Sequence, residues 1–142
     1  MHSIVLDTSV IVGALRSGQG AGNALLREVA QGNLELLATP ALFFEYEEVL
    51  KRAEHRIVTA MSEDAVDRFL AALASACRPV EIRYRWRPQL PDANDEMLLE
   101  AAVNGQADAL VTYNLKHFRT ASVRFGLRVM QPGTFLMEMR DG

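Results

Sequence analysis

The fold is decided by residues 3–9, which read Ser3-Ile4-Val5-Leu6-Asp7-Thr8-Ser9. A short apolar run bounded by polar residues is typical of a buried strand, and we expect a strand over Ser3–Leu6 and a helix over Ser9–Leu15. Asp7 then stands at the carboxyl end of the strand, where open parallel sheets bind their ligands. It would also cap the following helix, and a cap and a ligand can be the same residue.

The rest of the chain repeats this alternation of short apolar strands with helices, which predicts a mostly parallel sheet of about five strands covered on both faces. The architecture is therefore an α/β fold, a three-layer α/β/α sandwich, with residues 1–142 as one domain. Further strands are expected over Leu34–Leu37, Val80–Ile82, Ala109–Thr112 and Arg128–Met130. Further helices are expected over Asn23–Gln31, Pro40–Lys51, from Ser62 onward, Asn94–Asn104 and Phe135–Met139.

Composition excludes several classes of protein. The apolar content of 49% suits a packed core, while the net charge of −3 gives no general attraction to nucleic acid. A single cysteine, Cys77, excludes an internal disulfide and a cysteine zinc cluster, which favours a reducing, cytoplasmic location. The run Ser3–Leu6 before Asp7 has only four residues, too few for a signal peptide or a membrane span, so no association with a membrane is expected.

Four acidic or amide residues from distant segments are expected to meet at one end of the sheet: Asp7, Glu45, Asp95 and Asn114. Carboxylates gathered in this way repel one another unless a cation offsets the repulsion. A hard divalent ion, Mg²⁺ or Mn²⁺, prefers such oxygen ligands, and it points to hydrolysis or phosphoryl chemistry.

Each of these positions also has an ordinary structural explanation. Glu45 lies beside the apolar stripe of its helix, where an acid is costly unless it meets a cation. Asp92 and Asp95 begin the helix after Pro91 and are expected to point back to the strand ends, although acids there also suit the helix dipole. Asn114 follows its strand by two residues and is equally suited to a cap or turn.

A basic and aromatic segment precedes the acids. Arginines alternate with aromatic residues in Arg83-Tyr84-Arg85-Trp86-Arg87. This pattern fits an exposed strand edge or a groove that binds a nucleic-acid strand.

In this order, the segments resemble the PIN-domain family of metal-dependent ribonucleases, which includes the VapC-like toxins of bacterial toxin–antitoxin pairs. The resemblance covers nearly the whole chain. It depends on Ile4-Val5-Leu6-Asp7-Thr8-Ser9, Glu45-Tyr46, Glu48-Val49-Leu50-Lys51-Arg52, Pro91-Asp92, Asp95, Leu99-Glu100-Ala101 and residues 107–118 (Ala107-Asp108-Ala109-Leu110-Val111-Thr112-Tyr113-Asn114-Leu115-Lys116-His117-Phe118).

The resemblance implies a division of roles among the site residues. Asp7, Glu45 and Asp95 look like the family's three characteristic acids and would be catalytic. The metal would be bound by Asp7, Asp92, Asp95 and Asn114, and the substrate and water would be positioned by Ser9, Thr112, Asn114 and Lys116. The family's fourth acidic position is often aspartate, and Asn114 there removes one negative charge.

The implied activity is hydrolysis of single-stranded RNA by a Mg²⁺- or Mn²⁺-dependent ribonuclease, the toxin of a toxin–antitoxin pair. The implied partners are RNA, a cognate antitoxin protein and a second copy of the chain in a homodimer. Two alternatives stay open: a degenerate PIN-like domain that binds a metal or a partner with little catalysis, and a Mg²⁺-dependent phosphatase for a small substrate. The phosphatase would need an aspartate two residues after Asp7, where this chain has Ser9.

Overall fold

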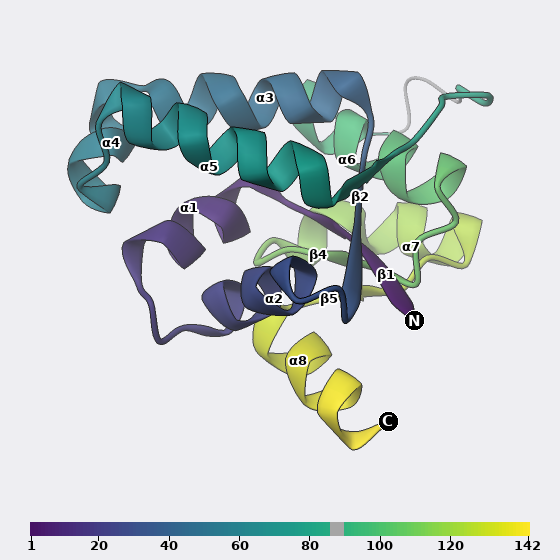
Figure 1. Ribbon diagram of the computed structural model, residues 1–142. Helices are drawn as coiled ribbons and strands as arrows, with labels where there is room; N and C mark the ends of the chain where they lie inside the picture. Colours follow the sequence, from purple (N-terminus) through teal and green to yellow (C-terminus); the bar gives the residue numbers. More distant parts are fainter. Residues whose placement is uncertain (86–89) are drawn as a thin grey trace.

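The computed structural model describes residues 1–85 and 90–142, so Trp86 and Arg87 of the basic and aromatic segment lie outside the described residues. Within these residues the strands form one five-stranded sheet in the order β3-β2-β1-β4-β5, and every neighbouring pair is parallel (Figure 1). The strands are β1 (His2–Leu6), β2 (Leu34–Ala38), β3 (Cys77–Pro79), β4 (Ala109–Val111) and β5 (Val129–Met130). The predicted parallel sheet of about five strands is confirmed.

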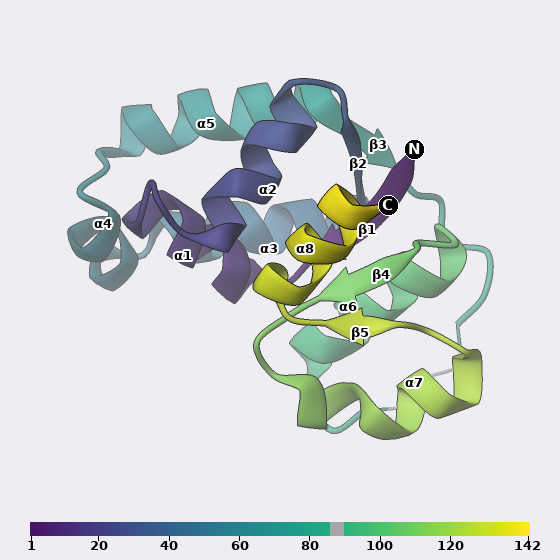
Figure 2. The same cartoon turned by 90° about the horizontal axis from the view of Figure 1, so that it is seen from below.

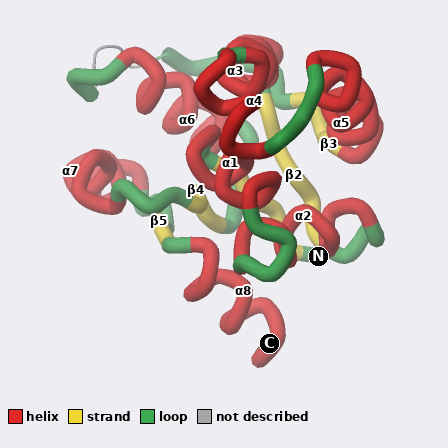
Figure 3. The backbone as a smooth tube through the Cα atoms, turned by 90° about the vertical axis from the view of Figure 1, so that its left-hand side faces the viewer, coloured by secondary structure: helices red, strands yellow, loops and turns green. Residues whose placement is uncertain are grey.

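Helices cover both faces of this sheet and confirm the three-layer sandwich. They are α1 (Thr8–Arg16), α2 (Ala21–Ala30), α3 (Pro40–Lys51), α4 (Ala53–Thr59), α5 (Glu63–Ala76), α6 (Ala93–Asn104), α7 (Arg119–Phe125) and α8 (Pro132–Asp141), with a 3₁₀ turn η1 (Leu115–Phe118) before α7. Figure 2 shows α2 and α8 in front of the strands with α3 and α6 behind them, and Figure 3 shows α3 above and α8 below. No helix in the described part of the chain is long and apolar enough to span a membrane.

The predicted strand over Val80–Ile82 is wrong, because the third strand is Cys77–Pro79. It pairs with the last three residues of β2, and the amide of Val80 donates to the carbonyl of Ala38. β2 ends at Ala38 and Thr39 caps α3, so Glu81 and Ile82 have no residue of β2 with which to pair.

Helices α4 and α7 were not anticipated from the sequence. Both are seven residues long, and neither begins with a side chain that caps it. Because none of the residues of α4 is buried, it lacks the apolar stripe that identifies a helix in a sequence.

The centre of the sheet determines where a ligand can bind. β1 lies in the middle, and the side chains of Ile4, Val5 and Leu6 are completely buried. The chain leaves β1 toward β2 on one side and later returns to β4 on the other. In sheets of this kind the crevice beyond the carboxyl ends of the strands at such a switch point is the usual ligand site. Asp7 directly follows β1, and Thr112 directly follows β4.

Candidate metal and nuclease site

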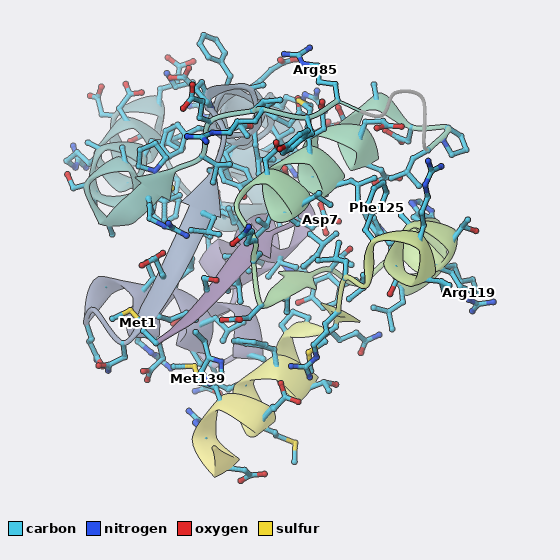
Figure 4. All side chains as sticks on the ribbon, turned by 90° about the vertical axis from the view of Figure 1, so that its right-hand side faces the viewer. Met1, Asp7, Arg85, Arg119, Phe125 and Met139 are labelled. Carbon is cyan, nitrogen blue, oxygen red and sulfur yellow. The ribbon has the colours of Figure 1, made fainter. Side chains whose placement is uncertain are left out.

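Asp7 lies at the carboxyl end of β1 (Figure 4). Both of its carboxylate oxygens accept hydrogen bonds. Its amide donates to the carbonyl of Val111 at 2.9 Å, which continues the β1–β4 pairing by one residue. Oδ1 accepts from the amide of Ser9 at 3.3 Å, so Asp7 is the cap of α1. Oδ2 accepts from the Thr112 hydroxyl at 2.7 Å. The expected cap is therefore observed, and the role of Asp7 as a metal ligand stays a prediction.

Thr112 orients Asp7 from the neighbouring strand. The hydroxyl is fully buried and accepts from the amide of Asn114 at 3.0 Å. Because the amide of Asn114 can only donate, the single hydroxyl hydrogen of Thr112 is left for the carboxylate of Asp7, which accepts it. Thr112, which the resemblance assigns to the positioning of substrate and water, thus contacts the carboxylate of Asp7.

Asp95 lies in the first turn of α6, and 12% of its side chain is exposed. Its Oδ2 lies 2.9 Å from Nδ1 of His117. Burial is the main cause that raises the pKa of the Asp95 carboxyl above its ordinary value, and the charge of Asp92 adds to the rise. The hydrogen bond from His117 lowers the same pKa, and the charge of Asp7 raises it again. The charges of Asp92 and Asp7 thus both act on the carboxyl of Asp95.

The other predicted site residues take different positions. Asp92 caps α6 and accepts from the amide of Asn94 at 2.8 Å. Asn114 is exposed at the start of η1, where its side chain caps nothing. Lys116 and Asp92 line one cavity with Asp95. Ser9 contributes its backbone amide to Asp7.

Glu45 lies half-buried in α3, where the structure gives it no hydrogen bond or ion pair to a described residue. The neighbouring Tyr46 is the residue that connects α3 to the site. Its hydroxyl is fully buried and donates to the carbonyl of Leu6, the residue before Asp7. Burial is the main cause that raises the pKa of Tyr46 well above its ordinary value, and the charges of Cys77 and Asp7 add to it.

Sequence reasoning missed three contacts that shape the site. The sequence did not indicate that the Tyr46 hydroxyl contacts the carbonyl of Leu6 or that the ring of His117 contacts Asp95. Glu96 is buried and accepts from the amide of Leu90, which fixes the chain just before α6. A tyrosine or an acid at a core position of a helix was the available signal, because a buried polar group needs a partner.

The donor atoms at this site suit a hard divalent cation. Asp7 and Asp95 supply carboxylate oxygens, with Asp92 close enough to act on Asp95. Among residues 1–85 and 90–142, no three side chains of the His, Cys, Asp and Glu types are close enough together to hold a metal ion. Mg²⁺ is usually bound by one or two carboxylates and keeps several waters, and Asp7 and Asp95 are the residues that would hold it.

A larger cavity lies away from this site. It measures about 700 Å³ and is lined mainly by apolar residues of α2 and α5, such as Leu26, Val29, Phe69 and Leu73. None of its described lining residues is titratable, so the acidic end of the sheet is the better candidate for chemistry.

These features define an α/β/α protein with an acidic centre at the switch point of its sheet. The family model for the PIN domain matches residues 3–116, most of the chain, and the protein belongs to the PIN-domain family. PIN domains are generally nucleases, and they typically use divalent metal ions. No curated protein matches the chain significantly.

Proposed function

We propose that this protein is a divalent-metal-dependent endoribonuclease that hydrolyses single-stranded RNA. The proposal is supported by the position of Asp7 directly after the central strand and by the charges of Asp7 and Asp92, which both act on the carboxyl of Asp95. It is also supported by the membership of the chain in a family of nucleases. The resemblance described above supplies the choice of RNA.

Each residue has a proposed role in that reaction. Asp7 and Asp95 would hold Mg²⁺ or Mn²⁺, and Asp92 would add its charge or bind through water. Such a cation supplies Lewis-acid activation of water and of the phosphodiester. Thr112 keeps the Asp7 carboxylate in one orientation through its hydroxyl, and His117 does so for Asp95.

Three further residues complete the proposed site. Lys116 makes no ion pair with any described residue, and its charge is available to a substrate phosphate. Glu45 and Asn114 would approach the cation through water, since the structure shows no direct contact between either side chain and the carboxylates.

The decisive experiment is RNA cleavage with Mg²⁺, Mn²⁺ or EDTA by the wild type, Asp7→Ala and Asp95→Ala. Asp64→Ala is the matched control, because Asp64 is an exposed acid in the first turn of α5. We expect cleavage by the wild type and the control only, with loss in EDTA and preference for single-stranded RNA over DNA. Equal cleavage by all four proteins would remove the nuclease assignment.

The biological setting proposed is a toxin restrained by a cognate antitoxin, acting as a homodimer in the cytoplasm. Exposed Phe44 on α3 is an available apolar contact for a partner. The test is growth after induced expression, alone and with the product of the adjacent reading frame, with Asp7→Ala as the inactive control. Arrest by Asp7→Ala as strong as by the wild type would contradict a toxin that acts by catalysis.

A second candidate is a PIN-like domain that binds a metal or a partner with little catalysis. Asn114 favours it, because an amide stands where the family often has an acid. Calorimetry with Mn²⁺ on the wild type and Asn114→Asp separates the two candidates. A large gain in affinity together with new cleavage in the variant would support the degenerate domain, and unchanged affinity would remove Asn114 as its basis.

A further inference from the structure

The cavity beside the acidic centre contains more than the carboxylates. It measures about 400 Å³, which is within the range of small-molecule sites. We call it the Thr120 pocket and define it by Leu90, Pro91, Lys116, His117 and Thr120, together with Asp92 and Asp95 of the acidic centre. We propose that the Thr120 pocket binds one nucleoside of the RNA strand, next to the phosphodiester that is cleaved.

The walls of the pocket differ in chemistry. Leu90 and Pro91 supply apolar surface against which a base can lie, and Glu96 holds that wall in place through the amide of Leu90. Thr120 supplies a hydroxyl that can donate and accept, and it lies in the first turn of α7. An apolar surface with a few polar groups that fix orientation is the usual composition of a site for a small organic ligand.

His117 and Lys116 give the pocket its polarity. The Nδ1 atom of His117 is engaged by Asp95, and the other ring nitrogen has no partner among the described residues. Nε2 is therefore available for a hydrogen bond with a base or a ribose hydroxyl. Lys116 is a cation without an ion pair among the described residues, beside two carboxylates that would repel a phosphate. The pocket therefore suits a nucleoside whose phosphate reaches Lys116.

This inference rests on the proposed RNA nuclease function, but its first test does not require cleavage. Adenosine, guanosine, cytidine and uridine are titrated separately into ¹⁵N-labelled protein in EDTA, and inorganic phosphate is titrated as a fifth probe. We expect at least one nucleoside to shift the amide signals of Leu90, His117 and Thr120 saturably. Phosphate alone should leave Leu90 unchanged. Absence of nucleoside shifts, or identical shifts with phosphate alone, would overturn the proposal.

The second test asks whether Thr120 reads the ligand. Thr120→Val keeps the shape and removes the hydroxyl, and we expect about tenfold weaker binding of the preferred nucleoside. Thr134→Val is the control, because Thr134 is exposed on α8 and does not line the pocket. Wild-type affinity for all four nucleosides in Thr120→Val would contradict selection by this residue and overturn the proposed binding mode.

RNA cleavage profiles separate this inference from the proposed function. If RNA is cleaved and Thr120→Val changes the preferred nucleotide at one position beside the cut, both stand. Cleavage without nucleoside binding, with the same sequence profile in Thr120→Val, contradicts the pocket and leaves the nuclease intact. Nucleoside binding without any cleavage supports the pocket and contradicts the nuclease.

Discussion

Replacement of Thr112 by valine removes one hydroxyl from the centre of the site and leaves the shape of the side chain unchanged. Thr112 is completely buried, donates to Oδ2 of Asp7 at 2.7 Å and accepts from the amide of Asn114 at 3.0 Å. A hydrogen bond to a charged group contributes about 1.5–3 kcal/mol, and the amide of Asn114 also loses its acceptor. We expect the free energy of unfolding at neutral pH to fall by about 2–4 kcal/mol.

The same change should impair the site itself. A residue that orients a metal ligand typically changes metal affinity or activity by about 10–100-fold when it is replaced. We expect a loss of this size in Mn²⁺ affinity by calorimetry, and in RNA cleavage if the proposed function is right.

Thr112→Ser is the matched control, because it keeps the hydroxyl and removes only a methyl group, at a cost of about 1 kcal/mol. Urea denaturation, calorimetry and cleavage are measured on the wild type and both variants. If Thr112→Val equals the wild type, or if Thr112→Ser is as damaging as Thr112→Val, the hydroxyl does not hold Asp7 and the reasoning is wrong.

Three other properties of the chain can be tested in the same preparations. Ala60 and Gly126 end their helices in the same left-handed conformation, with φ of 59° and 61°. Ala60→Gly should therefore raise the free energy of unfolding by about 1 kcal/mol, and Gly126→Ala should lower it by about 1 kcal/mol. Changes of the opposite sign, or of the same sign in both variants, in urea denaturation would refute this. Burial raises the pKa of the Cys77 thiol to about 11. At pH 7.5 iodoacetamide should therefore alkylate Cys77 about 100-fold more slowly than a thiol of ordinary pKa. An alkylation rate equal to that of an ordinary thiol, followed by mass spectrometry, would contradict the burial. Tyr46→Phe should lower the free energy of unfolding by about 1–3 kcal/mol, because the buried carbonyl of Leu6 loses its donor. Tyr113→Phe, at an exposed position, should leave the free energy of unfolding unchanged. Equal effects of the two variants would refute the role of Tyr46.

The parts of the fold that depend on neighbouring residues were predictable. A short apolar run followed by Asp7 and a helix start is a local pattern, and the structure places Asp7 where that pattern indicates. The first turn of α6 likewise begins at its acids, with Asp92 as the cap. Each of these features is determined within about one helical turn of sequence.

The features that escaped prediction depend on distant partners. The contact between Asp95 and His117 joins residues 22 apart, through a 3₁₀ turn that has no clear signal in the sequence. The Tyr46 hydroxyl reaches a carbonyl 40 residues away, so its role appears only once α3 is packed on β1. The position of β3 followed from where β2 ends, which the hydrophobicity of Val80 could not reveal.

The pairing of β1 with β4 has a consequence for the time at which the site forms during synthesis. Asp7 and its partner Thr112 are 105 residues apart, and their contact requires β4 to dock against the first strand of the chain. Domains fold as units while they emerge from the ribosome, and contacts between distant segments form late. A nascent chain that stops before β4 therefore contains Asp7 but lacks Thr112, whose hydroxyl orients the Asp7 carboxylate. The oriented carboxylate appears only after Thr112 has been synthesised, so shorter nascent chains lack an assembled site.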